Sequence, residues 1–410
     1  MKVLQVNYSD HLRGGGSAIA MYRLHLGLKK AGVDSKILCG NKSLDSDDSV
    51  QIKRNYRLES TLKSITSRLG LNDIHCHSSF KIKEEQIYQE ADVLNFHLIH
   101  SNFFNYLAIP SLTKEKPAVF TLHDMWSMTG HCAYSYDCDR WKIGCGKCPY
   151  PNTQPAINRD NSHLEWKLKE WVYNHSNLTI VADSHWLTQK AKASILNKFS
   201  IHHIPYGLDT DIYQPLNSQF CRNLLGIAPE KKVLMFSAVD LKDLRKGGDL
   251  LIKVLQSLPK SLKNEVILMV LGEGGEALVK SVDFPTMNFG YVSSDRLKAI
   301  LYSAADLFLL PSRAEAFGIV AQEAASCGIP TVAFNLGGIP DVVRQNVNGY
   351  LAKAENIQDF AQGIIQLLED DNLRKTMGYS GREIALLEYP LELQAKRYIE
   401  LYEHLLSKKS

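Results

Sequence analysis

Short apolar runs rich in β-branched residues alternate with longer segments of helical periodicity along almost the whole chain. The runs that predict strands are Val3–Val6, Ser35–Cys39, Val93–Phe96, Ala118–Leu122, Leu178–Ala182, Ile201–Ile204, Lys232–Ser237, Val266–Leu271, Leu307–Leu310 and Thr331–Phe334. The segments that predict helices are Ala18–Ala31, His163–His175, Leu250–Leu258, Ser294–Ala304, Gly318–Cys327 and Leu391–Leu406. Because strands and helices alternate, the pattern predicts an α/β protein whose parallel sheets carry helices on both faces.

The alternation pauses at residues 203–215, where proline and glycine interrupt the apolar runs. This pause predicts a boundary between two doubly wound, Rossmann-like domains, residues 1–205 and 206–385, which are expected to face each other across a cleft. A last helix, within residues 386–410, is expected to return to the first domain. The length of 410 residues suits two domains. Such sheets bind ligands at the C-terminal ends of their strands, so the loops there are the candidate sites.

Composition narrows the class of protein. Hydrophobic residues make up 45% and charged residues 22%, as in soluble globular proteins. The 47 basic and 44 acidic residues leave a formal charge of +3, which is too balanced to indicate a nucleic-acid partner. The N-terminus begins with a strand pattern and not with a secretory leader, and no segment approaches the ~18–20 apolar residues of a membrane span. We therefore expect a cytoplasmic protein, either free or at the inner face of the membrane.

The segment from Glu315 to Glu323 follows a predicted strand and opens a helix at Phe317 or Gly318. The N–H groups of a helix start suit a phosphate, and Gly318 allows a ligand close to the backbone. Glu315 could bind sugar hydroxyls, and Glu323 could hold both hydroxyls of a ribose. The plain alternative is a glutamate at a helix start followed by a surface glutamate.

Two loops after other predicted strands carry further candidates. Arg245 and Lys246 are adjacent cations, and a diphosphate binds a guanidinium through forked contacts and an ammonium as a point charge. A solvated loop would have the same composition. Gly14–Gly16 follow the first strand, where a backbone loop could pass near a ligand and Ser17 could cap the next helix. This segment matches neither the Walker A pattern nor the dinucleotide fingerprint, and a flexible turn is the alternative.

His123 follows the predicted strand Ala118–Leu122, and His97 and His100 follow another strand of the same domain. An imidazole in such a place can bind a sugar hydroxyl or pass a proton. A histidine satisfied inside the structure is the alternative, above all for His97 and His100.

Together these segments resemble family 4 of the retaining glycosyltransferases, which have the GT-B fold. The resemblance spans nearly the whole chain and is most specific at residues 311–332, 337–341 and 348–351. Glu315 and Glu323 stand there as the paired glutamates of the family, with seven residues between them. Residues 205–209 look like the interdomain Pro-Asn-Gly-Val-Asp segment, with Tyr206 in place of the asparagine.

The resemblance implies a retaining, metal-independent transfer of a hexose from a UDP- or GDP-linked donor to a saccharide or lipid-linked acceptor in polysaccharide biosynthesis. The implied catalytic residues are His123 near the reacting centre, Glu315 on the sugar, and Arg245 and Lys246 on the diphosphate. The implied donor-binding residues are Gly15, Gly16, Phe317, Gly318, Ile319, Val320, Val292 and, at the ribose, Glu323. One departure is Leu241, because the family has an arginine five residues before the lysine, so Arg245 would have to substitute for it.

Four of the eight cysteines, Cys132, Cys138, Cys145 and Cys148, lie close together after His131. A related branch of the family, of the bacterial polysaccharide type, has a similar loop. The spacing and the final Cys-x-x-Cys suit a structural zinc ion, while disulfides and unligated thiols are alternatives. We expect no cofactor in catalysis, and the Asp-Cys-Asp at 137–139 is interpreted as an incidental match to a metal motif.

Residues 57–70 place Leu58, Leu62, Ile65 and Leu69 on one helical face, with basic residues elsewhere. A helix facing the core is the favoured interpretation, and a peripheral contact with an anionic membrane is the alternative.

The same fold also allows other functions. A nucleotide-sugar epimerase is one alternative; a phosphorylase is disfavoured because the chain is short and has no candidate lysine segment for a pyridoxal cofactor. A non-catalytic nucleotide-sugar-binding module is opposed by the presence of His123, Lys246, Glu315 and Glu323 together.

Overall fold

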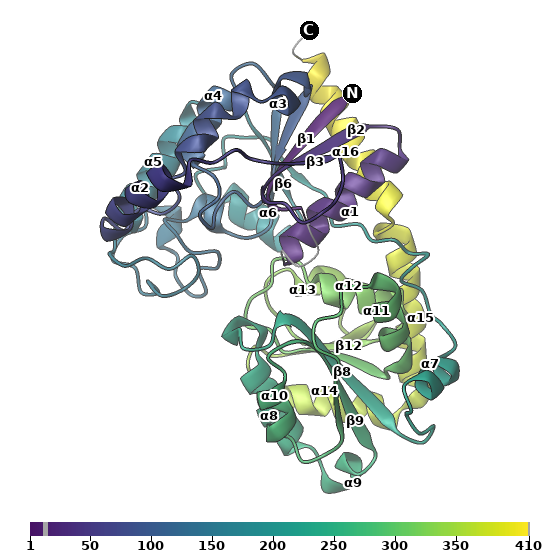
Figure 1. Ribbon diagram of the computed structural model, residues 1–410. Helices are drawn as coiled ribbons and strands as arrows, with labels where there is room; N and C mark the ends of the chain where they lie inside the picture. The colour runs from purple at the N-terminus through teal and green to yellow at the C-terminus, as the bar shows by residue number, and fades with distance from the viewer. Residues whose placement is uncertain (11–14, 409–410) are drawn as a thin grey trace. The chain divides into compact units, whose positions relative to one another are not determined.

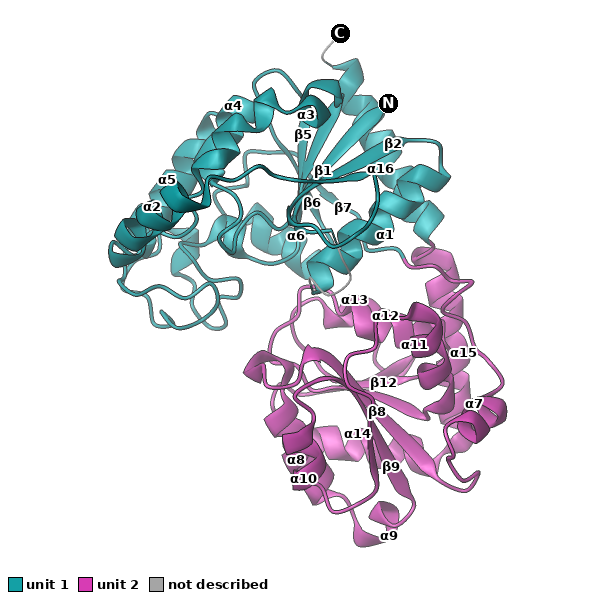
Figure 2. Ribbon diagram, in the orientation of Figure 1, with its two compact units in different colours: residues 1–207, 391–410 teal, residues 208–390 magenta. Residues whose placement is uncertain are grey.

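The computed structural model describes residues 1–10 and 15–408 and divides into two compact units, shown in Figure 2. Unit 1 comprises Met1–Gly207 and Leu391–Ser410, and unit 2 comprises Leu208–Pro390. The chain therefore passes between the units after Gly207 and after Pro390. The sequence had placed these crossings after residues 205 and 385.

Unit 1 is built on a seven-stranded sheet with the order β3-β2-β1-β4-β5-β6-β7, in which all neighbours are parallel (Figure 1). Its strands are β1 Lys2–Ser9, β2 Asp34–Asn41, β3 Ser49–Gln51, β4 Val93–Phe96, β5 Ala118–Leu122, β6 Thr179–Ala182 and β7 Ile201–His203. Its helices are α1 Gly16–Lys30, α2 Tyr56–Arg68, η2 His77–Glu84, α3 Gln86–Glu90, η3 Tyr106–Ala108, α4 Ile109–Leu112, η4 Trp126–Met128, η5 Arg140–Lys142, α5 Ser162–Asn174, α6 His185–Lys192 and α16 Leu391–Ser407. Every residue of β4, β5 and β6 is buried, as expected of parallel strands covered on both faces.

Unit 2 repeats the plan with a six-stranded parallel sheet of order β10-β9-β8-β11-β12-β13. Its strands are β8 Lys232–Asp240, β9 Val266–Glu273, β10 Thr286–Asn288, β11 Leu307–Leu310, β12 Thr331–Phe334 and β13 Gly349–Ala352. Its helices are α7 Ser218–Leu224, η6 Leu244–Lys246, α8 Gly248–Ser257, α9 Lys260–Lys263, α10 Glu276–Ser281, α11 Asp295–Ala304, α12 Ile319–Ser326, α13 Ile339–Val342, α14 Ile357–Glu369 and α15 Asp371–Glu388. Strand order reverses once in each sheet, between β1 and β4 and between β8 and β11. Such reversals are the places where doubly wound sheets bind ligands.

The C-terminal helix α16 belongs to the core of unit 1. Ala395, Tyr398 and Tyr402 are buried against β1, β4, β5 and α1. The Tyr402 hydroxyl accepts a hydrogen bond from Asn95 Nδ2 at 2.9 Å, and that of Tyr398 lies 3.0 Å from Thr121 Oγ1. The last helix therefore covers polar side chains of the sheet that would otherwise be buried without partners.

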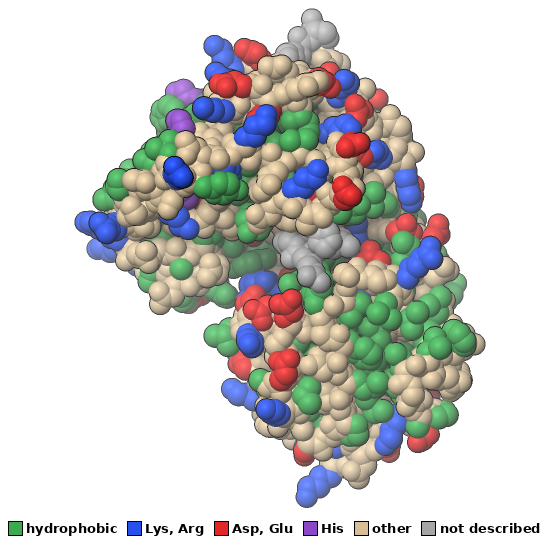
Figure 3. All heavy atoms as spheres, in the orientation of Figure 1, with side chains coloured by type: hydrophobic (Ala, Val, Ile, Leu, Met, Phe, Trp, Pro, Cys, Tyr) green, Lys and Arg blue, Asp and Glu red, His purple; other side chains and the backbone are tan. Residues whose placement is uncertain are grey.

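Hydrophobic side chains gather on one face of unit 2 over α7 and α11, where Phe220, Leu224 and Leu297 are exposed (Figure 3). Among the described residues, none of the helices combines the length and the hydropathy that a membrane crossing needs. The predicted fold class, two doubly wound α/β units, is confirmed.

Candidate active site

The reversal of strand order in unit 2 brings Lys246 and Glu315 together. Lys246 ends the short helix η6 after β8, and Glu315 lies on the loop after the neighbouring strand β11. Lys246 Nζ donates to Glu315 Oε1 at 2.5 Å, and Ser312 Oγ donates to the same oxygen at 3.0 Å. The predicted pair of loops is therefore one polar cluster, at the edge where a doubly wound sheet binds its ligand.

Two glycines make this close approach possible. Gly247 has φ +71°, and a Cβ there would lie 1.9 Å from the Pro311 carbonyl oxygen. Gly337 has φ +56°, and a Cβ there would lie 2.1 Å from the carbonyl oxygen of Glu315. A side chain at either position would push the loops apart, because such contacts are sterically forbidden and positive φ disfavours other residues.

The charged groups of the cluster lie at a largely buried site. Glu315 is 8% exposed, and burial alone would raise the pKa of its carboxyl, but Lys246 and Arg245 hold that pKa below its usual range. Burial, together with the nearby Arg245, lowers the pKa of Lys246, and Glu315 opposes this shift. An anionic ligand that replaced Glu315 as the partner of Lys246 would meet a cation that is already partly desolvated.

Arg245 takes part in the same cluster. Its Nη1 lies 3.9 Å from Glu315 Oε1 and donates to the Ala314 carbonyl at 3.2 Å, while Nη2 pairs with Asp243 at 3.0 Å. Leu241, at the position of the family's arginine, is instead buried in the core of unit 2. The geometry therefore allows Arg245 to serve in place of that arginine.

The helix after Glu315 opens as expected. Gly318 stands at the N-cap of α12 with φ +102°, and no side chain caps the helix start, which leaves its first N–H groups turned to the loop. Phe317 is buried, and Ile319 and Val320 form the first turn. Val292 lies 8% exposed in the loop after β10.

Glu323 is not a surface residue. It is 2% exposed, and the Tyr302 hydroxyl donates to its Oε2 at 3.2 Å. A glutamate is seldom buried this deeply unless it is paired, as Glu323 is with Tyr302, so the structure contradicts the alternative of a solvated surface glutamate.

In unit 1 a small pocket lies at the C-terminal ends of β4 and β5. It is lined by His97, Leu98, His100, Phe120, Leu122, His123, Asp124, Trp126 and Ser127. His100 Nε2 lies 3.1 Å from Asp124 Oδ2, and Trp126 N–H donates to Asp124 Oδ1 at 2.8 Å. Three histidines from the two loops after β4 and β5 therefore share one pocket.

Lys169 contacts Trp126, one of the residues that line this pocket, and the sequence pattern did not indicate it. The side chain is fully buried, its Nζ donates to the carbonyls of Trp126 at 2.7 Å and Thr129 at 3.0 Å, and it lies 3.6 Å from the Trp126 ring centroid. Burial lowers the pKa of Lys169 to about 8, and burial raises the pKa of nearby Glu165 to about 7. No local signal marks Lys169, because a lysine within a helical pattern usually lies in solvent.

The glycine-rich segment is only partly described. Gly15 has φ +86° at the N-cap of α1, and Gly16 is the first residue of that helix. The prediction that the loop lies near a ligand also involved Arg13 and Gly14, which lie outside the described residues.

The four clustered cysteines carry free thiols. Burial raises the pKa of Cys132 to about 12 and that of Cys145 to about 11. His131 Nε2 lies 3.1 Å from Cys148 Sγ, and Gly130 N–H donates to Cys145 Sγ at 3.1 Å. Among the residues that the structure describes, no three of these sulfur atoms lie within 4.8 Å of one another. The structural zinc ion stays a prediction.

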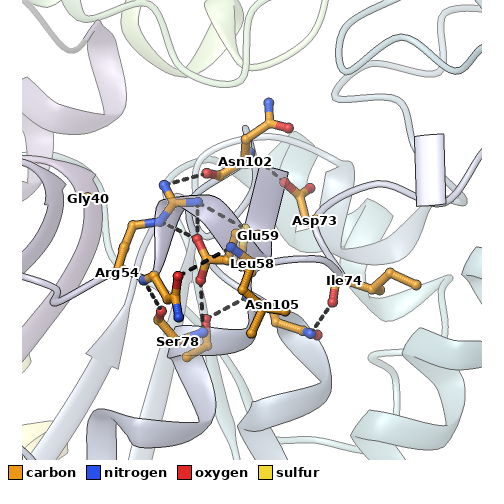
Figure 4. Close-up of polar contacts among 12 residues, drawn as sticks. Gly40, Arg54, Leu58, Glu59, Asp73, Ile74, Ser78, Asn102 and Asn105 are labelled. Carbon is orange, nitrogen blue, oxygen red and sulfur yellow. Dashed lines mark hydrogen bonds and ion pairs between the residues drawn. The ribbon is translucent and has the colours of Figure 1, made fainter. Parts of the chain in front are cut away.

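The helix α2 does not face the core, contrary to the favoured interpretation of its sequence. Glu59 is its one buried residue, whereas Leu58, Ile65 and Leu69 are 42%, 53% and 43% exposed. Figure 4 shows the reason: Glu59 points inward and pairs with Arg54 at 2.7 Å, and Ser78 N–H donates to it at 2.9 Å. Because polar contacts anchor its inner side, the apolar stripe remains on the surface.

Comparison with known proteins agrees with this architecture. Residues 14–212 match the family model described as Glycosyltransferase Family 4, and residues 219–384 match the one described as Glycosyl transferases group 1. WcaC of Escherichia coli K12, named provisionally as a colanic acid biosynthesis glycosyl transferase, is 24% identical over 99% of this chain and 100% of its own length. N-acetyl-alpha-D-glucosaminyl L-malate synthase of Bacillus anthracis is 26% identical over 54% of this chain and 58% of its own.

Solved structures show the same fold at low identity. Sucrose-phosphate synthase from Thermosynechococcus elongatus superposes with a TM-score of 0.72 at 17% identity, covering 100% of both chains. HepE of Anabaena, crystallised with UDP and glucose, gives 0.69 at 18% identity over 98% of this chain and 100% of its own.

Two Rossmann-like units, one with a part-buried cation–carboxylate cluster at its switch point, define the class of the GT-B glycosyltransferases. Within that class, the chain belongs to glycosyltransferase family 4, as the two family models together cover residues 14–212 and 219–384.

Proposed function

We propose that the protein transfers a hexose, with retention of anomeric configuration, from a UDP- or GDP-linked donor to a saccharide or lipid-linked acceptor in polysaccharide biosynthesis. The observation that carries this proposal is the part-buried contact of Lys246 with Glu315, with Arg245 beside it, at the switch point of unit 2. The crystallised complexes of HepE with UDP-glucose and the name of WcaC support the donor class and the pathway.

Each group has a task in this proposal. The donor diphosphate takes Lys246 and Arg245 as partners, and the N–H groups at the start of α12 add to the stabilisation of the leaving group. Glu315, released from Lys246, accepts hydrogen bonds from sugar hydroxyls, and Glu323 accepts those of the ribose. The bond from the anomeric carbon to the phosphate oxygen breaks, a bond to the acceptor oxygen forms on the same face, and the acceptor hydroxyl gives its proton to the leaving diphosphate. These protein groups meet the charge of the diphosphate, so the transfer needs no metal ion.

Transfer of a radiolabelled hexose, measured in the presence of EDTA, tests the reaction. Transfer or slow hydrolysis of the donor supports the proposal, and NMR of the product reports the anomeric configuration. Tight binding of a nucleoside diphosphate with neither transfer nor hydrolysis would instead favour a binding module, and conversion of the donor to its epimer would favour an epimerase.

A thermal-shift panel of nucleotide sugars identifies the donor. The matching donor, at about a hundredfold excess over its Kd, is expected to raise the Tm by about 5–10 °C, because it binds the native state alone. Free UDP, GDP and ADP serve as references. If every nucleotide sugar leaves the Tm unchanged, the donor assignment fails.

The surface of unit 1 suits contact with an anionic membrane at the cytoplasmic face, which would bring the enzyme to a lipid-linked acceptor. The exposed apolar stripe of α2 is flanked by exposed Arg57, Lys63 and Arg68, and basic side chains gather at this edge of unit 1 (Figure 3). We expect Leu58→Ser/Ile65→Ser to reduce sedimentation with phosphatidylglycerol vesicles at least about tenfold, since each residue would bury apolar area in the interface.

Phe220→Ser provides the matched control, because Phe220 is 62% exposed on α7 of unit 2. Equal loss of binding in both variants, or equal binding to phosphatidylcholine, would contradict a specific role for α2.

Metal analysis tests the cysteine loop. If Cys132, Cys138, Cys145 and Cys148 hold a structural zinc ion, the purified protein is expected to contain about one zinc per chain. Cys148→Ser should then release the metal, whereas Cys39→Ser, which changes a buried cysteine in β2, should retain it. Protein purified without chelator that contains no zinc would leave the free thiols as the native state.

A further inference from the structure

Tyr302, near the C-terminal end of α11, is hydrogen-bonded to Glu323 on the neighbouring helix α12. The Tyr302 residue is 1% exposed, and its hydroxyl donates to Glu323 Oε2 at 3.2 Å. The same hydroxyl lies 3.1 Å from the carbonyl oxygen of Val320, in the first turn of α12. Val320 and Glu323 are three residues apart and so lie on one face of the helix. One phenol therefore contacts both the backbone at the start of α12 and the carboxylate one turn further on.

Aromatic packing fixes the position of this phenol. The Tyr302 ring packs against Tyr213 with the ring centroids 6.4 Å apart at 62°, and against Phe308 of β11 at 5.6 Å and 58°. Both neighbours are fully buried, and the Tyr213 hydroxyl donates to Asp295 at 2.7 Å. Rings in a close-packed core keep one orientation on average. The Tyr302 oxygen is therefore a fixed point against which the Glu323 side chain is held.

The phenol has one hydrogen within reach of two acceptors. A carboxylate is a stronger acceptor than a backbone carbonyl, because a hydrogen bond to a charged group is the stronger one. If the hydrogen pointed to Val320, the phenolic oxygen would face Glu323 Oε2 at 3.2 Å with no hydrogen between the two oxygens, which is repulsive. The hydrogen therefore serves Glu323, and this bond limits the rotation of the carboxylate.

A carboxylate held in this way can still bind a ribose. Its two oxygens have about four acceptor positions, so one donor at Oε2 occupies a single position. The two hydroxyls of a ribose stand on adjacent carbons, and both can donate to one carboxylate only when its plane has the right orientation. A carboxylate that rotates about its last bond would lose this orientation, so a donor that fixes it reduces the entropy lost on binding.

We propose that Tyr302 is a positioning residue that holds the Glu323 carboxylate in the orientation that binds both ribose hydroxyls of a nucleoside diphosphate. This inference deepens the proposed function and rests on it for the role of Glu323. Its consequence is selectivity for ribose over 2′-deoxyribose, since the 2′-hydroxyl contributes fully only to an oriented carboxylate. The affinity that the diphosphate contributes should change little.

Isothermal titration calorimetry with UDP and 2′-deoxy-UDP, and with GDP and 2′-deoxy-GDP, tests the proposal. The wild type is expected to bind the ribonucleotide at least about tenfold more tightly than its deoxy analogue, the contribution of a hydrogen bond to a charged group. Tyr302→Phe, which keeps the ring and its packing, should lower this ratio at least about threefold, since part of that contribution is lost. Glu323→Gln should lower the ratio as well. A variant that is partly unfolded would bind both nucleotides less, which leaves their ratio unchanged.

Tyr350→Phe is the matched control, because the Tyr350 hydroxyl donates to Asp359 Oδ1 at 2.6 Å on β13, an edge strand of the same unit. It should keep the wild-type ratio.

A ratio that is lost in Glu323→Gln but kept or raised in Tyr302→Phe would overturn the inference and leave the proposed role of Glu323 intact. A wild type that binds the ribonucleotide and its deoxy analogue equally would contradict that role, and with it the inference. Absence of binding to all four nucleotides would contradict the proposed class of donor itself.

Discussion

Lys246→Met is expected to lower kcat/KM for sugar transfer by about 10²–10³, as loss of one preorganised donor to a developing negative charge does in other enzymes. The Lys246 side chain is 20% exposed, and its Nζ lies 2.5 Å from Glu315 Oε1. The same ammonium would meet the leaving diphosphate, and methionine fills its volume without the charge.

The control for this prediction is Lys242→Met, which removes an exposed cation from the same loop and should leave kcat/KM within about twofold. Glu315→Gln separates two roles of the lysine. If Lys246 serves only to neutralise Glu315, the double variant Lys246→Met/Glu315→Gln should recover activity. If both side chains bind the donor, as we propose, the double variant should remain at least as slow as Lys246→Met.

Arg54→Met is expected to lower the free energy of unfolding of unit 1 by about 3–5 kcal/mol, the usual cost of leaving a buried ion without its partner. The Glu59 side chain is 2% exposed and that of Arg54 is 13% exposed, with 2.7 Å between Arg54 Nη2 and Glu59 Oε2 (Figure 4). All five tryptophans lie in unit 1, so urea unfolding followed by tryptophan fluorescence reports on this unit alone.

Lys53→Met is the matched control, because Lys53 pairs with Glu85 at 3.2 Å but its side chain is 83% exposed, and such pairs contribute at most about 1 kcal/mol.

Burial would raise the pKa of Glu59, but the Ser78 N–H and Arg54 hold it below its usual value. The contribution of this carboxylate is therefore present above the pKa of the unfolded chain and is lost as the pH falls through the folded pKa. The difference between wild type and Arg54→Met should shrink in acid; a difference that is small at pH 7 or constant with pH would contradict the prediction.

Sequence patterns located every strand inside the two sheets but only one of the four edge strands, β7. All ten predicted strands are present, but β3, β10 and β13, each of three or four residues, were not predicted. These three strands are edge strands of their sheets. An edge strand is short and partly exposed, so it lacks the continuous apolar run that marks a strand buried on both faces.

For the candidate site and the surface of unit 1, too, the sequence indicated some features and missed others. Local motifs were enough to single out Lys246, Glu315 and His123, because residues that follow parallel strands gather at one edge of a sheet. Helical periodicity also located α2, but could not tell which side of it faces the protein. Arg54 and Ser78, which lie outside α2, decide this orientation because they form the ion pair and the hydrogen bond of Glu59.

What the sequence determined by itself is the order of strands and helices, the fold class and the loops that carry the candidate chemistry, since these depend on spacing along the chain. Only the tertiary structure decided that Glu323 is buried, that Lys169 lies under the pocket and that Tyr206 meets His123. The physical reason is that burial and the pairing of polar groups depend on neighbours distant in sequence. His123 and Tyr206 are 83 residues apart along the chain and 2.5 Å apart in space.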